Sequence, residues 1–117
     1  MLVVYASLTG NVRRFVASLG EPAVEFTAQS AAAEPFIFVT YTIGFGEVPA
    51  GVDEWLQSNR ANLRGIVVSG NRNWGANFGK AGDILAARYN VPLLRKIELA
   101  GTATDIRTII ERMRLIE

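Results

Sequence analysis

The sequence contains no cysteine and no histidine among its 117 residues. Their absence excludes disulfides, thiol catalysis, zinc fingers and serine–histidine triads, and it removes the usual ligands of most transition-metal sites. The net charge is also small, at +1, because 12 basic side chains are balanced by 11 acidic ones. A chain so close to neutral gives no reason to expect a nucleic-acid partner or a membrane surface.

Long hydrophobic runs are missing as well. The apolar residues 1–6 have no basic flank and are too few for a signal peptide. No run approaches the roughly 20 residues that cross a bilayer, so we expect a cytoplasmic protein. The hydrophobic fraction is 50%, which favours a sizeable core over disorder. The length predicts one domain covering residues 1–117.

Short apolar runs alternate with helical patterns along the chain. Helical spacing of apolar residues begins near Val12, Val52 and Phe78, and again after Thr102, a candidate N-cap. This alternation predicts an α/β fold, a parallel sheet with helices on both faces. The predicted strands are Leu2–Tyr5, Ala23–Phe26, Phe36–Tyr41, Ile66–Val68 and Leu93–Leu99.

Three loops of unusual composition follow the ends of predicted strands. They cover residues 7–11, 40–48 and 69–75. The carboxyl ends of parallel strands meet at one edge of the sheet, where ligands of open α/β sheets bind. The sequence therefore predicts one site built from three loops.

The first loop has the composition of a phosphate site. Ser7 and Thr9 supply hydroxyl groups, Gly10 allows a close turn, and the helix that follows begins near Val12. The amides and dipole of a helix N-terminus favour an anion. Because the loop has no lysine and lacks the P-loop spacing, a single phosphate held mainly by hydroxyls and amides is favoured over a nucleoside triphosphate. The alternative is that these residues only cap the helix.

Glycines beside aromatic residues characterise the second and third loops. Glycine exposes its backbone to a ligand, and an aromatic side chain can stack on a flat ring. The pattern suits a planar heteroaromatic with a polar edge, although the aromatics could equally fold back onto the core. The residues concerned are Tyr41, Gly44, Phe45, Gly46, Asn71, Asn73, Trp74 and Gly75.

Charged residues near the predicted site are few. Glu47 is the carboxylate expected to face it, and Arg72 is the positive counterpart, although each also suits a solvated loop. Asp53 and Glu54 are adjacent on a helix and form no convincing acid/base pair. Trp55 lies on the same helix with Leu56 and is expected to pack in the core or at its edge.

Longer motifs resemble a known family. Ser7-Leu8-Thr9-Gly10-Asn11, followed by Val12-x-x-Phe15, resembles the phosphate loop of flavodoxin-like proteins. Residues 40–49 and 69–78, with the turn at 89–92 and the segment 98–102, more specifically resemble the NrdI family. Members of that family are flavodoxin-like partners of class Ib ribonucleotide reductase. The resemblance covers essentially the whole chain.

The resemblance implies a flavodoxin-like three-layer sandwich. Its five-stranded parallel sheet would have the order 2-1-3-4-5, with FMN at the switch point, and this chain would hold no metal. The residues expected to bind the phosphate are Ser7, Leu8, Thr9, Gly10, Asn11 and Val12. Those expected around the isoalloxazine are Thr40, Tyr41, Thr42, Gly44, Phe45, Gly46, Ser69, Gly70, Asn71, Asn73, Trp74 and Gly75.

The resemblance also implies a role as an accessory flavoprotein with no catalytic side chain. Such a protein receives electrons from a flavodoxin reductase or a similar donor and reduces O2 to superoxide or a related oxidant. The oxidant is delivered to the dimanganese small subunit of class Ib ribonucleotide reductase, where it generates the tyrosyl radical. We further expect the peptides of Gly44-Phe45-Gly46 to respond to the redox state of the flavin.

Two alternatives are compatible with the same topology. A generic electron-transfer flavodoxin would pass electrons on without using O2, but such proteins are typically longer and strongly acidic. A receiver-like signalling domain needs an acidic cluster and a phosphorylatable Asp at the strand ends. Here the first predicted strand leads into Tyr5-Ala6-Ser7 and the third ends in Thr40-Tyr41, which disfavours the receiver.

Overall fold

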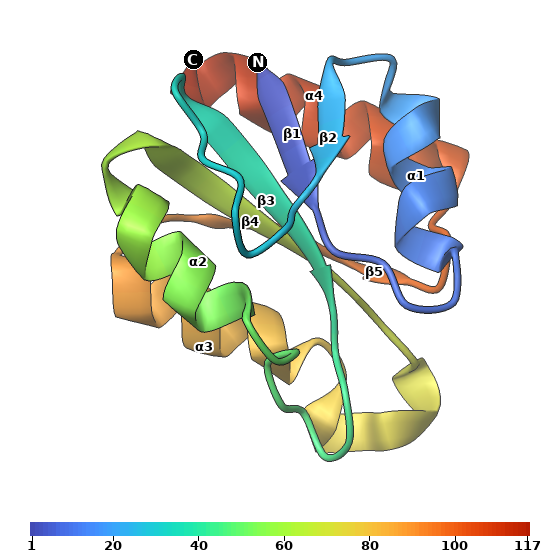
Figure 1. Cartoon of the computed structure of the whole chain (residues 1–117). Helices are drawn as coiled ribbons and strands as arrows, with labels where there is room; N and C mark the ends of the chain where they lie inside the picture. Colours follow the sequence, from blue (N-terminus) through green and yellow to red (C-terminus); the bar gives the residue numbers. More distant parts are fainter.

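Five parallel strands form a single sheet in the computed structural model, which describes residues 1–117 (Figure 1). The strand order is β2-β1-β3-β4-β5, and all four pairs of neighbouring strands are parallel. This confirms the order and orientation predicted from the sequence. The strands are β1 (Leu2–Tyr5), β2 (Ala23–Glu25), β3 (Phe36–Tyr41), β4 (Leu63–Gly70) and β5 (Leu93–Glu98).

Helices cover both faces of this sheet, as the α/β prediction requires. Helices α1 and α4 pack on one face, and α2 and α3 pack on the other (Figure 1). The helices are α1 (Asn11–Leu19), α2 (Val52–Asn59), α3 (Lys80–Tyr89) and α4 (Ala103–Ile116), with short 3-10 helices η1 (Arg60–Asn62) and η2 (Arg72–Asn77).

Strand β3 lies at the centre of the core because its alternate side chains enter opposite layers. Ile37 and Val39 pack toward α1 and α4, whereas Phe36 and Phe38 pack toward α2 and α3. A strand buried on both faces reads as a continuous apolar run, which explains why its bounds were predictable. Trp55 is buried against Phe36, with ring centroids 5.5 Å apart, and this confirms its core position.

Element boundaries differ from the sequence prediction in four places. Strand β2 ends at Glu25, one residue before the predicted Phe26. Strand β4 extends well beyond Ile66–Val68, because pairing with β3 and β5 continues through Ser69 and Gly70. Strand β5 ends at Glu98, one residue early, because Leu99 has a positive φ of 54°. Helix α3 begins at Lys80 after the left-handed Gly79, because residues 72–77 form η2.

No helix of the chain is both long enough and apolar enough to span a bilayer. The cytoplasmic location expected from the sequence stays a prediction.

Candidate functional site

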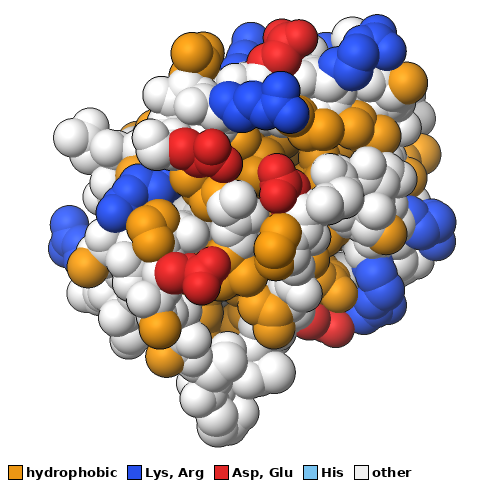
Figure 2. Space-filling model, turned by 90° about the horizontal axis from the view of Figure 1, so that it is seen from above, with side chains coloured by type: hydrophobic (Ala, Val, Ile, Leu, Met, Phe, Trp, Pro, Cys, Tyr) orange, Lys and Arg blue, Asp and Glu red, His pale blue; other side chains and the backbone are white.

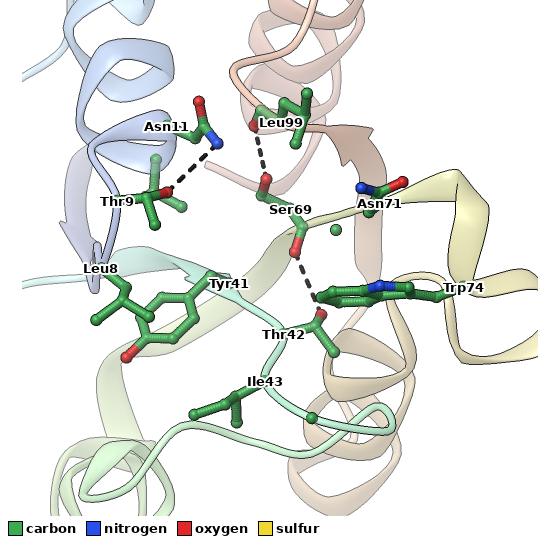
Figure 3. Close-up of a pocket in the computed structure, with 13 residues that line it drawn as sticks. Leu8, Thr9, Asn11, Tyr41, Thr42, Ile43, Ser69, Asn71, Trp74 and Leu99 are labelled. Atoms are coloured by element: carbon green, nitrogen blue, oxygen red, sulfur yellow. Dashed lines mark hydrogen bonds between the residues drawn. The ribbon is translucent and has the colours of Figure 1, made fainter.

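A cavity of about 350 Å³ opens at the carboxyl ends of the strands (Figure 3). All three predicted loops contribute to it, so segments far apart in the sequence meet at one place. The lining residues are Leu8, Thr9, Asn11, Val12, Tyr41, Thr42, Ile43, Gly44, Ser69, Gly70, Asn71, Trp74 and Leu99. The convergence inferred from the loops is therefore present in the structure.

Some predicted site residues lie beside the cavity without lining it. Thr40 is fully buried, and its hydroxyl donates to the carbonyl of Tyr41 at 3.0 Å. Phe45 is 82% exposed at the tip of its loop, where it can meet a partner more readily than a ligand. The predicted residues outside the lining are Ser7, Gly10, Thr40, Phe45, Gly46, Asn73 and Gly75.

The first loop presents a row of free backbone donors. None of the backbone amides of residues 7–12 donates a hydrogen bond within the chain. Gly10 is the N-cap of α1, with a left-handed φ of 92° and no side-chain cap. Ser7 Oγ accepts from the amide of Arg13 at 3.3 Å. Ser7 thus satisfies one helix amide, as the capping alternative proposed, while the remaining amides stay open to a ligand.

The second loop is a short hairpin at the cavity mouth. The backbones of Ile43 and Glu47 are paired by two hydrogen bonds, of 3.0 and 2.8 Å. Between them, Gly44 and Gly46 both have positive φ, at 58° and 98°. A Cβ on Gly46 would lie 2.8 Å from the side chain of Lys80. Both conformation and space therefore demand glycine at residue 46.

The third loop holds an aromatic side chain over the cavity. Asn71 Oδ1 accepts from the amide of Asn73 at 2.9 Å, and the Trp74 amide donates to the carbonyl of Asn71 at 3.0 Å. These bonds shape η2, which the sequence prediction treated as an irregular loop. Trp74 is 40% exposed and lines the cavity, so it is not a core residue.

A fourth segment, which the sequence analysis missed, completes the lining. Leu99 follows β5, and its positive φ of 54° is costly for a residue with a Cβ. Two hydrogen bonds hold it: its amide donates to Gly70 O at 3.0 Å, and Ser69 Oγ donates to its carbonyl at 2.6 Å. Thr42 Oγ1 in turn donates to Ser69 O at 3.2 Å (Figure 3). These hydrogen bonds connect the ends of three strands. The position of Leu99 directly after a predicted strand was the one feature of the sequence that could have indicated its place in the site.

The lining contains no charged residue. Glu47 lies in the hairpin but does not line the cavity. Arg72 also lies outside it and pairs with Glu98, with 3.6 Å between Nε and Oε1. Its guanidinium lies over the ring of Phe78, 5.0 Å from the ring centre. The positive charge expected beside the site is thus exposed and partly compensated by an acidic neighbour.

The sheet order, the layers and a cavity at the strand ends with a helix N-terminus define a flavodoxin-like protein. Solved structures support this class. A short-chain flavodoxin associated with a bacterial microcompartment matches with a TM-score of 0.72 at 19% identity, covering 98% of this chain and 94% of that one. A Fusobacterium nucleatum flavodoxin bound to flavin mononucleotide matches with a TM-score of 0.67 at 17% identity, covering 99% and 98%.

Sequence comparison assigns the family within this class. The model of the NrdI flavodoxin-like family matches residues 3–111. The SPbeta prophage-derived protein NrdI of Bacillus subtilis is 46% identical over 117 residues, which cover 97% of this chain and 91% of that protein. The chain belongs to the NrdI flavodoxin-like family, as its motifs indicated.

Proposed function

We propose that the chain binds one FMN in the cavity at the strand ends, with the phosphate at residues 7–12. The observation that carries this proposal is the row of backbone amides in that segment, none of which has a partner within the chain. Free amides at a helix N-terminus are the donors that a phosphate requires. The hydroxyl of Thr9 and the side-chain amide of Asn11 line the same end of the cavity.

The rest of the cavity suits a flat ring with polar edges. Tyr41 and Trp74 offer aromatic surfaces from two different loops, and rings of this kind stack on planar ligands. Gly44 and Gly70 expose backbone groups in the lining, where a larger side chain would cover them. We assign the isoalloxazine to this part, with Leu99 as an additional contact.

We further propose that the chain receives electrons from a flavodoxin reductase or similar donor and serves the dimanganese small subunit of class Ib ribonucleotide reductase. Bound FMN would supply electrons to O2, and the resulting superoxide or related oxidant would generate the partner's tyrosyl radical. Family membership supports this role. The uncharged lining also supports it, since nearby carboxylates would oppose added negative charge.

Exposed apolar side chains around the cavity mouth support a protein partner at this edge. Leu8, Phe45 and Leu99 are all exposed there. Exposed apolar clusters of this kind mark interaction surfaces. Phe45 is the sharpest probe, because it is 82% exposed and does not line the cavity.

The test is radical assembly in the manganese-loaded small subunit. With the reduced, FMN-loaded protein and O2, we expect superoxide-linked oxygen consumption and a tyrosyl-radical signal in electron paramagnetic resonance. Phe45→Glu should lower the radical yield, whereas Leu115→Glu on α4, where Leu115 is 84% exposed, should not. Electron transfer to other acceptors without any radical would instead favour the generic flavodoxin.

The hairpin tip is the proposed redox-responsive segment. Gly44 and Gly46 flank Phe45, and only the Ile43–Glu47 backbone pair closes the hairpin beneath them. Glycine permits either peptide orientation at low cost. We expect the backbone of Gly44 to differ between oxidised and reduced crystals of the FMN-loaded protein, and identical conformations would refute this expectation.

A further inference from the structure

Two neighbouring arginines in the first turns of α1 have different partners. Arg13 is tied to Glu25, with its Nη2 2.9 and 3.1 Å from the two carboxylate oxygens. The hydrogen bond to Glu25 raises the pKa of Arg13. Arg14 forms no ion pair with any carboxylate of the chain. The positive charge of Arg13 is thus compensated by Glu25, whereas no carboxylate of the chain compensates the charge of Arg14.

The guanidinium of Arg14 lies against the phosphate loop. Its Nη1 is 3.0 Å from the place that a Cβ on Gly10 would occupy. Its Nη2 donates to Asn11 Oδ1 at 2.5 Å. Gly10, which also needs its φ of 92°, leaves room for this arrangement. A Cβ there would require the end of the Arg14 side chain to shift by a few tenths of an ångström.

The bond from Arg14 determines how Asn11 faces the cavity. Because Asn11 Oδ1 accepts from Arg14, its Nδ2 is turned the other way, toward Thr9 Oγ1 at 3.4 Å (Figure 3). Asn11 and Thr9 both line the cavity. The acceptor end of the side-chain amide is therefore occupied, and the donor end faces the site. An anion is bound by donors and repelled by acceptors.

We propose that Arg14 is the positioning residue of the phosphate end, and that it makes the site selective for phosphorylated flavin over riboflavin. It holds the Asn11 amide with its donor inward and adds an uncompensated positive charge to a loop that has none. The sequence of the first loop, which has no lysine, predicted a phosphate held mainly by hydroxyls and amides, and it gave no role to Arg14. This inference rests on the proposed binding of FMN in the cavity.

Equilibrium binding of FMN and riboflavin to the apoprotein, followed by flavin fluorescence, tests the proposal. Arg14→Gln should weaken FMN binding about 10-fold and change riboflavin binding less than about twofold, because riboflavin has no phosphate. The loss should shrink in 1 M salt, since screening weakens exposed charges. Arg14→Lys, which keeps the charge but not the fork of donors, should fall between wild type and Arg14→Gln.

Arg13→Gln is the matched control, because it removes the same charge from the same helix turn. Since Glu25 already compensates Arg13, FMN affinity should change less than about twofold. Equal losses for FMN and riboflavin in Arg14→Gln, or equal losses in the two arginine variants, would overturn the role of Arg14. A wild-type protein that binds neither flavin would instead refute the proposed function itself.

Discussion

The two ends of the sheet differ in whether particular polar groups have hydrogen-bond partners within the chain. At the carboxyl ends of the strands, the amides of residues 7–12 lack partners within the chain, and Leu99 has a strained backbone. At the amino ends, polar groups are joined to one another. Asn59, which is buried, accepts from the Ala32 amide at 3.0 Å and donates to Trp55 O at 2.8 Å.

Ion pairs occur at both ends of the sheet, and it is the cavity lining that is free of charge. The N-terminal ammonium of Met1 lies 3.6 Å from Glu21 and 3.4 Å from Glu117. Figure 2 looks onto the side that carries both termini, where acidic and basic side chains lie among apolar ones. The cavity at the other end has no charged residue in its lining. Polar groups that are hydrogen-bonded within the chain stabilise the fold, whereas donors without partners and strained backbone are features of binding sites. Variants at the two ends should therefore have separable effects.

A negative charge in the phosphate loop should have the largest effect. Thr9→Asp puts a carboxylate where Thr9 lines the cavity, so FMN binding should weaken on the order of 100-fold by repulsion of the phosphate. Fluorescence titration measures the loss. Thr9→Asn is the neutral control, and riboflavin should bind both variants similarly. A 100-fold loss for riboflavin as well would mean that the cavity had been deformed.

At the opposite end, Asn59→Ala should lower stability by about 2 kcal/mol, because it leaves the Ala32 amide without a partner. Chemical denaturation of the apoprotein measures this change. FMN affinity of the folded variant should stay within twofold. Ser58→Ala, on the exposed side of α2, serves as the control with little effect. A marked loss of FMN affinity in Asn59→Ala would show that the two ends are coupled.

Trp74→Ala should weaken binding of FMN and riboflavin alike, by about 10-fold, since both share the ring that Trp74 is proposed to stack on. Equal losses distinguish this residue from those of the phosphate loop. Trp74→Phe should recover most of the affinity. A loss confined to FMN would place Trp74 at the phosphate instead.

Asp105 holds the start of α4, which follows the segment that carries Leu99. Loss of its carboxylate should lower the free energy of unfolding by about 1 kcal/mol. Asp105 forms a capping box with Thr102 and pairs with Arg95 at 2.5 Å. Burial alone would raise the pKa of Asp105, but the bonds from Arg95 and Thr102 outweigh it, and the net shift is downward. The stabilisation is therefore complete above the unfolded pKa of about 3.9. It is lost as the pH falls through the lower folded value.

Denaturation of Asp105→Asn between pH 2 and 7 measures this contribution. The variant should be less stable at pH 7, and the difference from wild type should narrow in acid as Asp105 becomes protonated. A difference that stays constant with pH would contradict the assignment.

The smallest effect is expected at the N-terminus. Glu21→Gln removes one of two carboxylates near the Met1 ammonium, and such surface pairs are worth less than about 1 kcal/mol. Neither FMN affinity nor stability should change appreciably. Glu21→Gln combined with Glu117→Gln should still cost less than the loss of Asn59.

Most of the fold could be predicted because the strands are apolar runs of definite length. Phe36–Tyr41 was bounded correctly, since burial on both faces leaves a clear pattern. Ser69 and Gly70 were assigned to a loop because their polar or small side chains do not mark a strand, although backbone pairing extends β4 through them. Backbone hydrogen bonds leave no trace in side-chain periodicity.

The site was predictable in outline but not in detail. Strand-end loops located the cavity, yet nothing in the residue type of Leu99 signals its left-handed backbone, which hydrogen bonds to β4 impose. The orientation of Asn11 depends on Arg14 reaching back over Gly10. Such contacts follow from side-chain conformations, which the order of residues alone does not specify.

Titration of the apoprotein with FMN tests the central claim most directly. The absorption bands of oxidised flavin and the quenching of flavin fluorescence should saturate at one FMN per chain for the wild type. Thr9→Asp should need on the order of 100-fold more FMN to saturate. A protein that stays colourless and leaves FMN fluorescence unchanged, or one that Thr9→Asp does not affect, would contradict the account.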